Sequence, residues 1–368
     1  MKHPNDAFAR HLDDLKKYLE RIFTMLKDTQ SIYSFTLDEL ELAFTSIGIP
    51  KYRALQVFSW LYDKGVSSYD EMTNLPKSMR EQLSSCFPIE SISISKRLLS
   101  KDGSVKYLLE LHDGCLVETV GIPSDSNRLT VCVSTQSGCA MGCIFCATGK
   151  CGLNRSLEPG EIVRQVIAVQ NEFSSRVTNV VLMGQGEPFA NYENVLTALR
   201  IINHPKLLGI GARHLTVSTC GLIDGINKFS HEREQFTLAV SLHSAIQSKR
   251  DVLIPAMKSQ KLSVLRNTLI EYSGSTGRRY SFEYALMKDL NDSEEDLSNL
   301  IKYCSNLLCH VNLIPLNKVP GSEIHPVSNT VMQHWNSELL NTGIASSIRN
   351  SRGSDIAAAC GQLALSSK

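Results

Sequence analysis

Residues 136–146 read QSGCAMGCIFC and place Cys139, Cys143 and Cys146 within one short loop that contains glycines. Three thiolates at this spacing can wrap one face of a compact metal centre. A [4Fe–4S] cluster takes four thiolates, so three local ligands leave one iron open to chelate another molecule. The loop follows a predicted strand, and this arrangement directs the interpretation of the rest of the chain.

The cysteines are unevenly distributed. The chain has eleven, and five of them lie between Cys132 and Cys151. Disulfide frameworks belong mainly to small secreted domains, whereas grouped cysteines in a reducing compartment bind metal or take part in catalysis. A structural zinc site usually draws four ligands from two separated pairs, so zinc completed by Cys132 or Cys151 is the alternative to an iron–sulfur cluster.

No part of the sequence looks like a membrane or export segment. A membrane-spanning helix needs roughly 20 apolar residues, and no such run occurs. The N-terminal region carries Asp6, Asp13, Asp14 and Glu20, whereas secretory signals have an uninterrupted apolar core and transit peptides are poor in acids. We therefore expect a cytoplasmic protein with no membrane partner.

The second half of the chain alternates short apolar runs with helical patterns, which predicts a parallel sheet, either doubly wound or curled into a barrel. Ligands of such folds lie at the carboxyl ends of the strands. The predicted strands span 129–134, 179–183, 214–218, 236–241, 280–284, 310–314 and 345–348. The predicted helices between them span 160–173, 192–202, 294–306 and 331–342.

The first half divides into three further segments. Residues 1–33 have apolar positions at helical spacing and predict one amphipathic helix. Residues 34–90 predict a small helical accessory domain, whose first helix would begin at Thr36 with Glu39 three positions later. Residues 91–128 predict a β-hairpin and a linker, and residues 129–365 the catalytic domain.

A second motif makes the cysteine loop more specific. Residues 184–188 read GQGEP directly after a predicted strand, where glycines permit close backbone approach and Glu187 can accept hydrogen bonds. The Cys-x3-Cys-x2-Cys spacing, with Phe145 before the last cysteine, resembles the radical S-adenosylmethionine (SAM) superfamily. That resemblance implies a partial (βα)6 barrel and a cluster whose open iron binds the amino and carboxylate groups of SAM.

Four further sequence motifs make the resemblance more specific. Residues 117–120, 241–243, 310–315 and 355–363 read VETV, SLH, HVNLIP and DIAAACGQL. Together with the cysteine loop they resemble the RlmN/Cfr family of dual-specificity RNA adenine methyltransferases, over residues 34–365. Gly121-Ile122-Pro123 is more similar to the RlmN branch, which methylates adenine carbon 2, than to the Cfr branch, which methylates carbon 8 and confers antibiotic resistance.

The resemblance implies a mechanism with defined residues. Cys360 would accept a methyl group from one SAM, and a radical made from a second SAM would activate that methyl group for addition to adenine. Cys132 would then form a transient disulfide with Cys360, after Glu118 takes the adenine proton. Adenine carbon 2 is not a nucleophile, so radical chemistry from a cofactor suits this methylation.

The resemblance also implies the cofactor contacts and the partners. One [4Fe–4S] cluster per chain and two SAM molecules per turnover are expected, with an external flavodoxin-like or ferredoxin-like electron donor and a monomeric enzyme. The implied SAM contacts are Gly186, Glu187, Ser218, Ser241, Leu242, His243 and Asn317.

The implied substrate is an adenosine in the peptidyl-transferase region of 23S rRNA and, in some members, the adenosine 3′ of the tRNA anticodon. The formal net charge of +1 shows no global positive field for RNA. In the accessory domain, Lys51, Arg53, Lys77 and Arg80 are candidate phosphate contacts, or else simply solvated helix faces. A rival of another class is a non-catalytic iron–sulfur protein that binds RNA or senses redox state.

Overall fold

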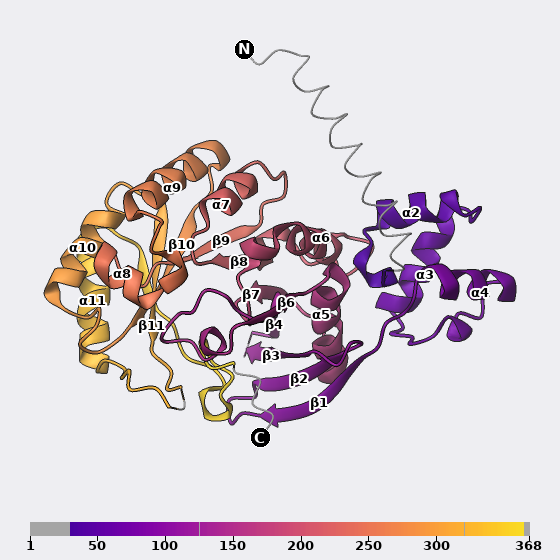
Figure 1. The fold of residues 1–368 in the computed structure, drawn as a ribbon, viewed down its shortest axis with the longest axis horizontal. Coiled ribbons are helices and arrows are strands. Elements are labelled where there is room, and N and C mark those ends of the chain that lie inside the picture. The colour runs from indigo at the N-terminus through magenta and orange to yellow at the C-terminus, as the bar shows by residue number, and fades with distance from the viewer. Residues whose placement is uncertain (1–29, 125, 320, 364–368) are drawn as a thin grey trace, which may run out of the picture.

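The computed structural model describes residues 30–124, 126–319 and 321–363. Their main feature is a ten-stranded sheet with the order β1-β2-β3-β4-β7-β8-β9-β10-β11-β12 (Figure 1). The first four strands pair antiparallel, and every pair from β4 to β12 is parallel. The predicted N-terminal helix lies outside the described residues, except that Ile32–Ser34 form a short 3-10 turn, η1.

The parallel strands are joined by helices, as the sequence predicted. The strands are β4 (Arg128–Cys132), β7 (Asn179–Leu182), β8 (Leu215–Thr219), β9 (Thr237–Ser241), β10 (Tyr280–Leu286), β11 (Cys309–Pro315) and β12 (Ser346–Ile348). The helices are α5 (Pro159–Phe173), α6 (Tyr192–Asn203), α7 (Ile223–Ser230), α8 (Gln247–Leu253), α9 (Leu262–Thr276), α10 (Glu294–Cys304) and α11 (Asn329–Asn341). This succession confirms the predicted α/β partial barrel.

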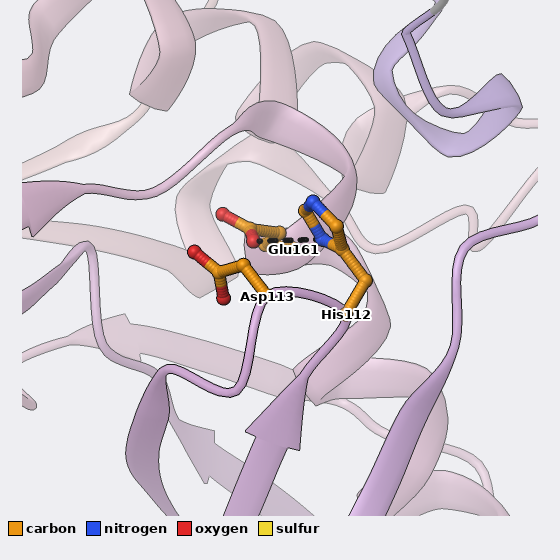
Figure 2. Close-up of side chains that lie close together, drawn as sticks. All are labelled: His112, Asp113 and Glu161. Atoms are coloured by element: carbon orange, nitrogen blue, oxygen red, sulfur yellow. Dashed lines mark ion pairs between the residues drawn. The ribbon is translucent and has the colours of Figure 1, made fainter.

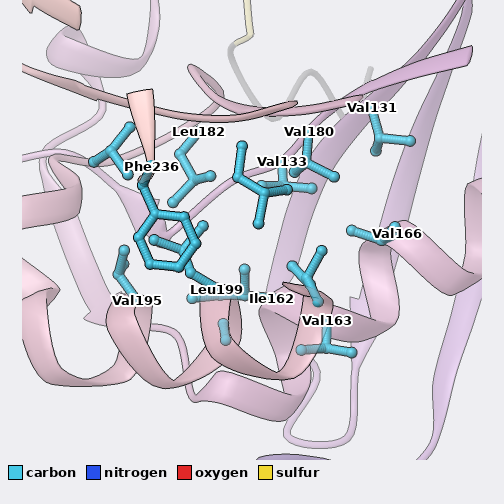
Figure 3. Close-up of a cluster of buried hydrophobic side chains, with 14 of the residues drawn as sticks. Val131, Val133, Ile162, Val163, Val166, Val180, Leu182, Val195, Leu199 and Phe236 are labelled. Carbon is cyan, nitrogen blue, oxygen red and sulfur yellow. The ribbon is translucent and has the colours of Figure 1, made fainter. Parts of the chain in front are cut away.

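The core lies between the strands and their helices. Val131 and Val180 of neighbouring strands pack with Ile162 and Val166 of α5 (Figure 3). Successive side chains of a strand point to opposite faces of the sheet. Val131 points toward the helices, so its neighbour Cys132 points away from them. The same alternation turns every second side chain of the strands toward the inner face of the partial barrel.

The small helical unit is built as the sequence predicted. It contains α2 (Leu37–Ser46), α3 (Tyr52–Tyr62), η2 (Tyr69–Glu71) and α4 (Lys77–Cys86). Thr36 and Glu39 form the predicted capping box at the start of α2. The unit contacts α5, because the amide of Gly160 donates to Ser34 Oγ at 3.1 Å and the Arg164 guanidinium lies over the Tyr33 ring.

Three antiparallel strands, rather than the predicted hairpin and linker, join this unit to the barrel. They are β1 (Ile92–Leu99), β2 (Val105–Leu111) and β3 (Leu116–Ser124). A separate pair, β5 (Gln136–Gly138) and β6 (Leu153–Ser156), brackets the cysteine loop. Among the described residues, no helix is long and apolar enough to cross a membrane.

Candidate functional site

A cavity of about 150 Å³ opens at the carboxyl ends of the parallel strands. Parallel α/β folds place their ligands at this end of the sheet. The cavity gathers most of the residues that the sequence singled out. Those that line it are Cys139, Cys143, Cys146, Gly186, Glu187, Ser218, Ser241, His243, Asn317 and Cys360.

The cysteine loop is fixed by backbone hydrogen bonds on three sides. The Cys139 amide donates to the carbonyl of Gly152 at 2.8 Å, beside the β5–β6 pair. The Ile144 amide donates to the carbonyl of Leu253 at the end of α8, and the Ala147 amide donates to that of Gly361. The three thiols therefore face the cavity from a loop held by the barrel and by the C-terminal segment.

The chemistry of the loop fits an anionic iron–sulfur cluster. Burial raises the pKa of the Cys139 thiol to about 12, so in the absence of metal its proton stays on, and a bound metal would replace it. Neither Cys132 nor Cys151, the fourth ligands that the zinc alternative required, lines the cavity. Three cysteines around one cavity, two buried and one partly exposed, match a cluster with an open iron.

Glu187 is held rigidly at the cavity wall. Its Oε2 accepts from the Cys220 amide at 2.7 Å, and its Oε1 accepts from the Phe189 amide at 3.0 Å. Burial raises the pKa of this carboxyl, although these hydrogen bonds oppose the effect. A side chain at Gly186 would meet Gln136 at 2.6 Å, and its φ of 102° also favours glycine. Each carboxylate oxygen retains a lone pair for a further donor.

His243 offers a neutral hydrogen-bond donor. Its Nδ1 accepts from the Ala285 amide at 3.0 Å, and burial lowers its pKa to about 3. The imidazole is therefore neutral, and because Nδ1 accepts, Nε2 carries the hydrogen. The ring meets Phe145 of the cysteine loop edge to face, with centroids 4.6 Å apart.

Leu242 is placed differently from its neighbours. Ser241 and His243 line the cavity, whereas the Leu242 side chain is fully buried in the main core. Its backbone carbonyl accepts from Arg250 Nε at 3.2 Å. On the far wall, Asn317 Nδ2 donates to the carbonyl of Cys360 at 3.2 Å, which joins a predicted cofactor contact to the C-terminal segment.

Cys132 and Cys360 are brought together from distant parts of the chain. Cys132 packs with Ala358 and Leu363, which flank Cys360 in the sequence. Burial, with a smaller contribution from the neighbouring Cys360 thiol, raises the pKa of Cys132 to about 12. Burial also raises the pKa of the Cys360 thiol, although the Arg349 guanidinium opposes this. Both sulfurs are thus protonated thiols at neutral pH until a reaction partner removes the proton.

Glu118 does not line the cavity. Val120 lies opposite Cys132 in the β3–β4 register, and Glu118, two residues earlier, projects on the same face. The Glu118 carboxylate is buried in an ion pair with Lys106, with Nζ and Oε1 2.9 Å apart. Lys106 Nζ also donates to the carbonyl of Ala357 at 3.0 Å, so the predicted base lies beneath the segment that carries Cys360.

Sequence reasoning missed two residues that line the cavity, Cys220 and Glu283, and one that lies behind it, Arg250. Cys220, to which the sequence assigned no role, lines the cavity beside Cys143. Arg250 is fully buried behind the cysteine loop. Glu283 lines the cavity, with its Oε1 hydrogen-bonded by Ser281 and Asn312 and its Oε2 without a partner. The signal for Glu283 was a lone acid within the apolar strand β10.

A second group of titratable side chains lies outside the cavity, where His112, Asp113 and Glu161 converge (Figure 2). Arg155 already neutralises this group. Its Nε lies 2.7 Å from Asp113 Oδ2, and its Nη1 and Nη2 bind both oxygens of Glu161. The Arg155 hydrogen bond lowers the pKa of Asp113. The cluster therefore ties the β2–β3 turn to α5.

Comparison with known proteins agrees with this geometry. The model of the "Ribosomal RNA large subunit methyltransferase N-terminal domain" matches residues 30–89, and that of the "Radical SAM superfamily" matches residues 133–301. A crystal structure of a radical SAM methyltransferase from Sphaerobacter thermophilus is 41% identical, with a TM-score of 0.87, and the match covers 91% of this chain and 99% of that one.

Two sequence relatives carry the name "Probable dual-specificity RNA methyltransferase RlmN". The protein of Bacillus velezensis is 46% identical over 336 residues, which is 90% of this chain and 92% of the relative. That of Staphylococcus aureus strain Newman is 44% identical over 339 residues, 91% of this chain and 93% of the relative. The chain therefore belongs to the RlmN family of radical SAM RNA methyltransferases.

Proposed function

We propose that this enzyme methylates carbon 2 of an adenosine in the peptidyl-transferase region of 23S rRNA, and also the adenosine 3′ of the tRNA anticodon. The observation that carries the proposal is the approach of Cys132 to the Cys360 segment at a cavity lined by the three cysteines of the loop. A simple iron–sulfur binding protein needs the loop alone. A methyl relay needs the second pair of cysteines as well.

Cys139, Cys143 and Cys146 would hold one [4Fe–4S] cluster per chain, and Glu187 and His243 would bind SAM. When bound and reduced by an external flavodoxin-like or ferredoxin-like donor, the cluster and SAM supply a radical that abstracts hydrogen from a methyl group. The buried carboxylate of Glu187 accepts from the ammonium group of SAM, and the neutral His243 donates from Nε2. The working unit is a monomer that uses two SAM molecules per turnover.

Cys360 carries the methyl carbon. Its sulfur bonds to the methyl group of the first SAM as the methyl–sulfonium bond breaks and the thiol proton leaves. This gives a thioether that faces the cavity and releases S-adenosylhomocysteine. After hydrogen abstraction, this carbon bonds to adenine carbon 2. The unpaired electron of the adduct would pass back to the oxidised cluster, and Glu118 takes the proton from that position. Cys132 then attacks the sulfur of Cys360, so that a disulfide forms and the carbon–sulfur bond breaks. The released carbon takes up a proton and leaves as the methyl group of the product.

The decisive experiment follows the methyl group. Anaerobically reconstituted enzyme is incubated with SAM, reductant and an rRNA fragment, and the RNA is digested to nucleosides for mass spectrometry. We expect 2-methyladenosine from the wild type and none from Cys360→Ala. Cys132→Ala should accumulate a protein–RNA adduct on a denaturing gel. Cys151→Ala, whose side chain lies outside the cavity, is the matched control and should resemble the wild type.

Each other outcome has a defined meaning. The appearance of 8-methyladenosine would place the enzyme with the Cfr activity. A Cys360→Ala protein that still methylates RNA would refute the methyl relay. A wild-type protein that assembles its cluster but produces neither 5′-deoxyadenosine nor methylated RNA would support the non-catalytic iron–sulfur alternative.

A further inference from the structure

Arg250, on α8, is a buried cation without an acidic partner. Its side chain is fully buried, and its Nη2 donates to the carbonyl of Cys220 at 2.6 Å. Nε donates to the carbonyl of Leu242, and Nη1 has no hydrogen-bond partner. Within residues 30–363, apart from the two masked positions, no carboxylate lies at ion-pair distance from this guanidinium. Its direct partners are therefore neutral carbonyls.

Such a group is costly to bury. A charge transferred from water to a protein interior is strongly destabilised unless an opposite charge compensates it. Arginine does not escape this cost by losing its proton, because its pKa is too high. Burial lowers the pKa of Arg250, which records the same unfavourable environment. The described part of the chain thus contains a buried positive charge that no carboxylate contacts directly.

The contacts of Arg250 place its charge next to the cysteine loop. Helix α8 packs on the cysteine loop, since the Ile144 amide donates to the carbonyl of Leu253, and Leu253 and Cys143 share one apolar cluster. Cys220, whose carbonyl binds Nη2, lines the cavity beside Cys143. The guanidinium therefore acts on the cavity from behind the loop.

We propose that Arg250 is the protein's counter-charge for the iron–sulfur cluster held by Cys139, Cys143 and Cys146, and that it raises the cluster's reduction potential. This inference rests on the proposed function of the loop. Three thiolates make the bound centre anionic, and reduction adds one more negative charge from the external donor. A nearby buried cation stabilises the reduced form more than the oxidised form, because the protein interior screens charges weakly.

The test compares variants of reconstituted enzyme in a redox titration followed by electron paramagnetic resonance, without SAM or RNA. Arg250→Gln keeps hydrogen-bond donors but removes the charge. We expect about a tenfold lower ratio of reduced to oxidised cluster at a given potential, equivalent to about 59 mV for one electron. Arg250→Lys keeps the charge and should stay close to the wild type. Lys258→Met, which removes an exposed charge just beyond α8, is the matched control.

A second measurement separates the charge from the packing. Thermal unfolding of wild type and Arg250→Gln is recorded with and without the cluster, so that the loss of backbone hydrogen bonds cancels in the comparison. We expect the substitution to lower the unfolding temperature more in the loaded protein than in the apoprotein. An equal loss in both forms would show that Arg250 only holds the backbone, and the inference would be wrong.

Failure of the proposed function and failure of the role of Arg250 give different results. If the wild type assembles no cluster, or if replacing the three loop cysteines leaves cluster binding intact, the proposed function itself is overturned. If the cluster assembles in Arg250→Gln with the same potential as in Lys258→Met, only the role of Arg250 is overturned. Arg250→Met gives a second neutral variant should Arg250→Gln fail to fold, and the same shift is expected from it.

Discussion

Lys106 joins the proposed base to the segment that carries the methyl group. Its Nζ lies 2.9 Å from Glu118 Oε1 and 3.0 Å from the carbonyl of Ala357, and its side chain is 5% exposed. The ion pair fixes the position of the buried Glu118 carboxylate. The hydrogen bond to Ala357 also keeps Glu118 close to the segment that carries Cys360. A single residue thus couples two parts of the reaction.

Lys106→Met should therefore uncouple the late step from the early one. We expect methylation of Cys360 to continue, while release of the RNA adduct slows by about 100-fold, the lower range for loss of a general base. Mass spectrometry of the Cys360 peptide measures the first step. The fraction of protein crosslinked to RNA on a denaturing gel measures the second.

Ser100→Ala provides the control, because Ser100 Oγ holds the same segment through Asp355 without touching Glu118. Ser100→Ala is expected to affect only the methylation of Cys360. If Lys106→Met has the same effect and no adduct accumulates, Lys106 only holds the C-terminal segment in place. Glu118→Gln should accumulate the adduct in either case if the base assignment is right.

Sequence reasoning at this scale found residues whose neighbours in the chain reveal them. The three loop cysteines share one short motif, and Cys360 lies in a distinctive motif, residues 355–363. Arg250 was missed because it stands out only by being buried without an acidic partner. No local sequence pattern shows this. Leu242 was grouped with Ser241 and His243, and the structure places its side chain in the main core just past the end of β9.

Among the elements, the turn between β1 and β2 holds the C-terminal segment in place. Asp102 Oδ2 accepts from the Gly353 amide at 2.8 Å, and Asp355 Oδ1 accepts from Ser100 Oγ at 2.6 Å. Hydrogen bonds from the Gly353 and Ser104 amides outweigh burial and lower the pKa of Asp102 to about 2. A depressed pKa means that this contribution to stability is present above about pH 4 and is lost as the pH falls toward 2.

Asp102→Ala should loosen the segment at neutral pH. We expect Cys132, which is buried against Ala358 and Leu363 of this segment, to react with iodoacetamide several-fold faster than in the wild type, because the segment must open before this thiol is alkylated. Peptide mass spectrometry of timed samples gives the rate. Asp113→Ala, at the next turn of the same strands, leaves the C-terminal segment untouched, and an equal acceleration there would contradict the proposed clamp.

The sequence predicted α5, α6, α10 and α11, but it missed the short helices α7 and α8 and also α9, which has 15 residues. Helices α5 and α6 showed their periodicity over three turns or more, whereas α7 and α8 have only 8 and 7 residues. Such short runs do not separate a helix from a buried strand by pattern alone. Strand β3 was predicted as a linker, although the word VETV within it marked a site. The long-range contacts of the C-terminal segment had no local signature.

At the scale of the whole molecule, the residues proposed for chemistry and those proposed for RNA contact lie on separate units. Every residue assigned to the reaction falls between Glu118 and Cys360, whereas the helical unit packs on α5 through Tyr33 and Ser34 (Figure 1). A net charge of +1 could not locate an RNA surface, because opposite charges elsewhere cancel a local one. The division implies that RNA binding can be weakened without loss of the early chemistry.

The candidate phosphate contacts are not equivalent in the structure. Arg80 is a structural residue, since its Nη1 donates to the carbonyl of Asp70 at 2.7 Å, and Arg53 is engaged by Gln56 and Tyr52. Lys51, exposed at the start of α3, and Lys77, whose contact with Glu81 spans 3.8 Å at the surface, remain available to an outside partner. Exposed pairs of this kind contribute little to stability.

Reversing these two charges should therefore affect the RNA and not the protein's own chemistry. For the double variant Lys51→Glu and Lys77→Glu we expect KM for the rRNA fragment to rise about tenfold, with a weaker salt dependence because fewer counterions are released. Methylation of Cys360 in the absence of RNA should stay unchanged. Lys302→Glu on α10 is the matched control. An unchanged KM in the double variant would mean that these lysines are only a solvated helix face, and that RNA is held by another surface.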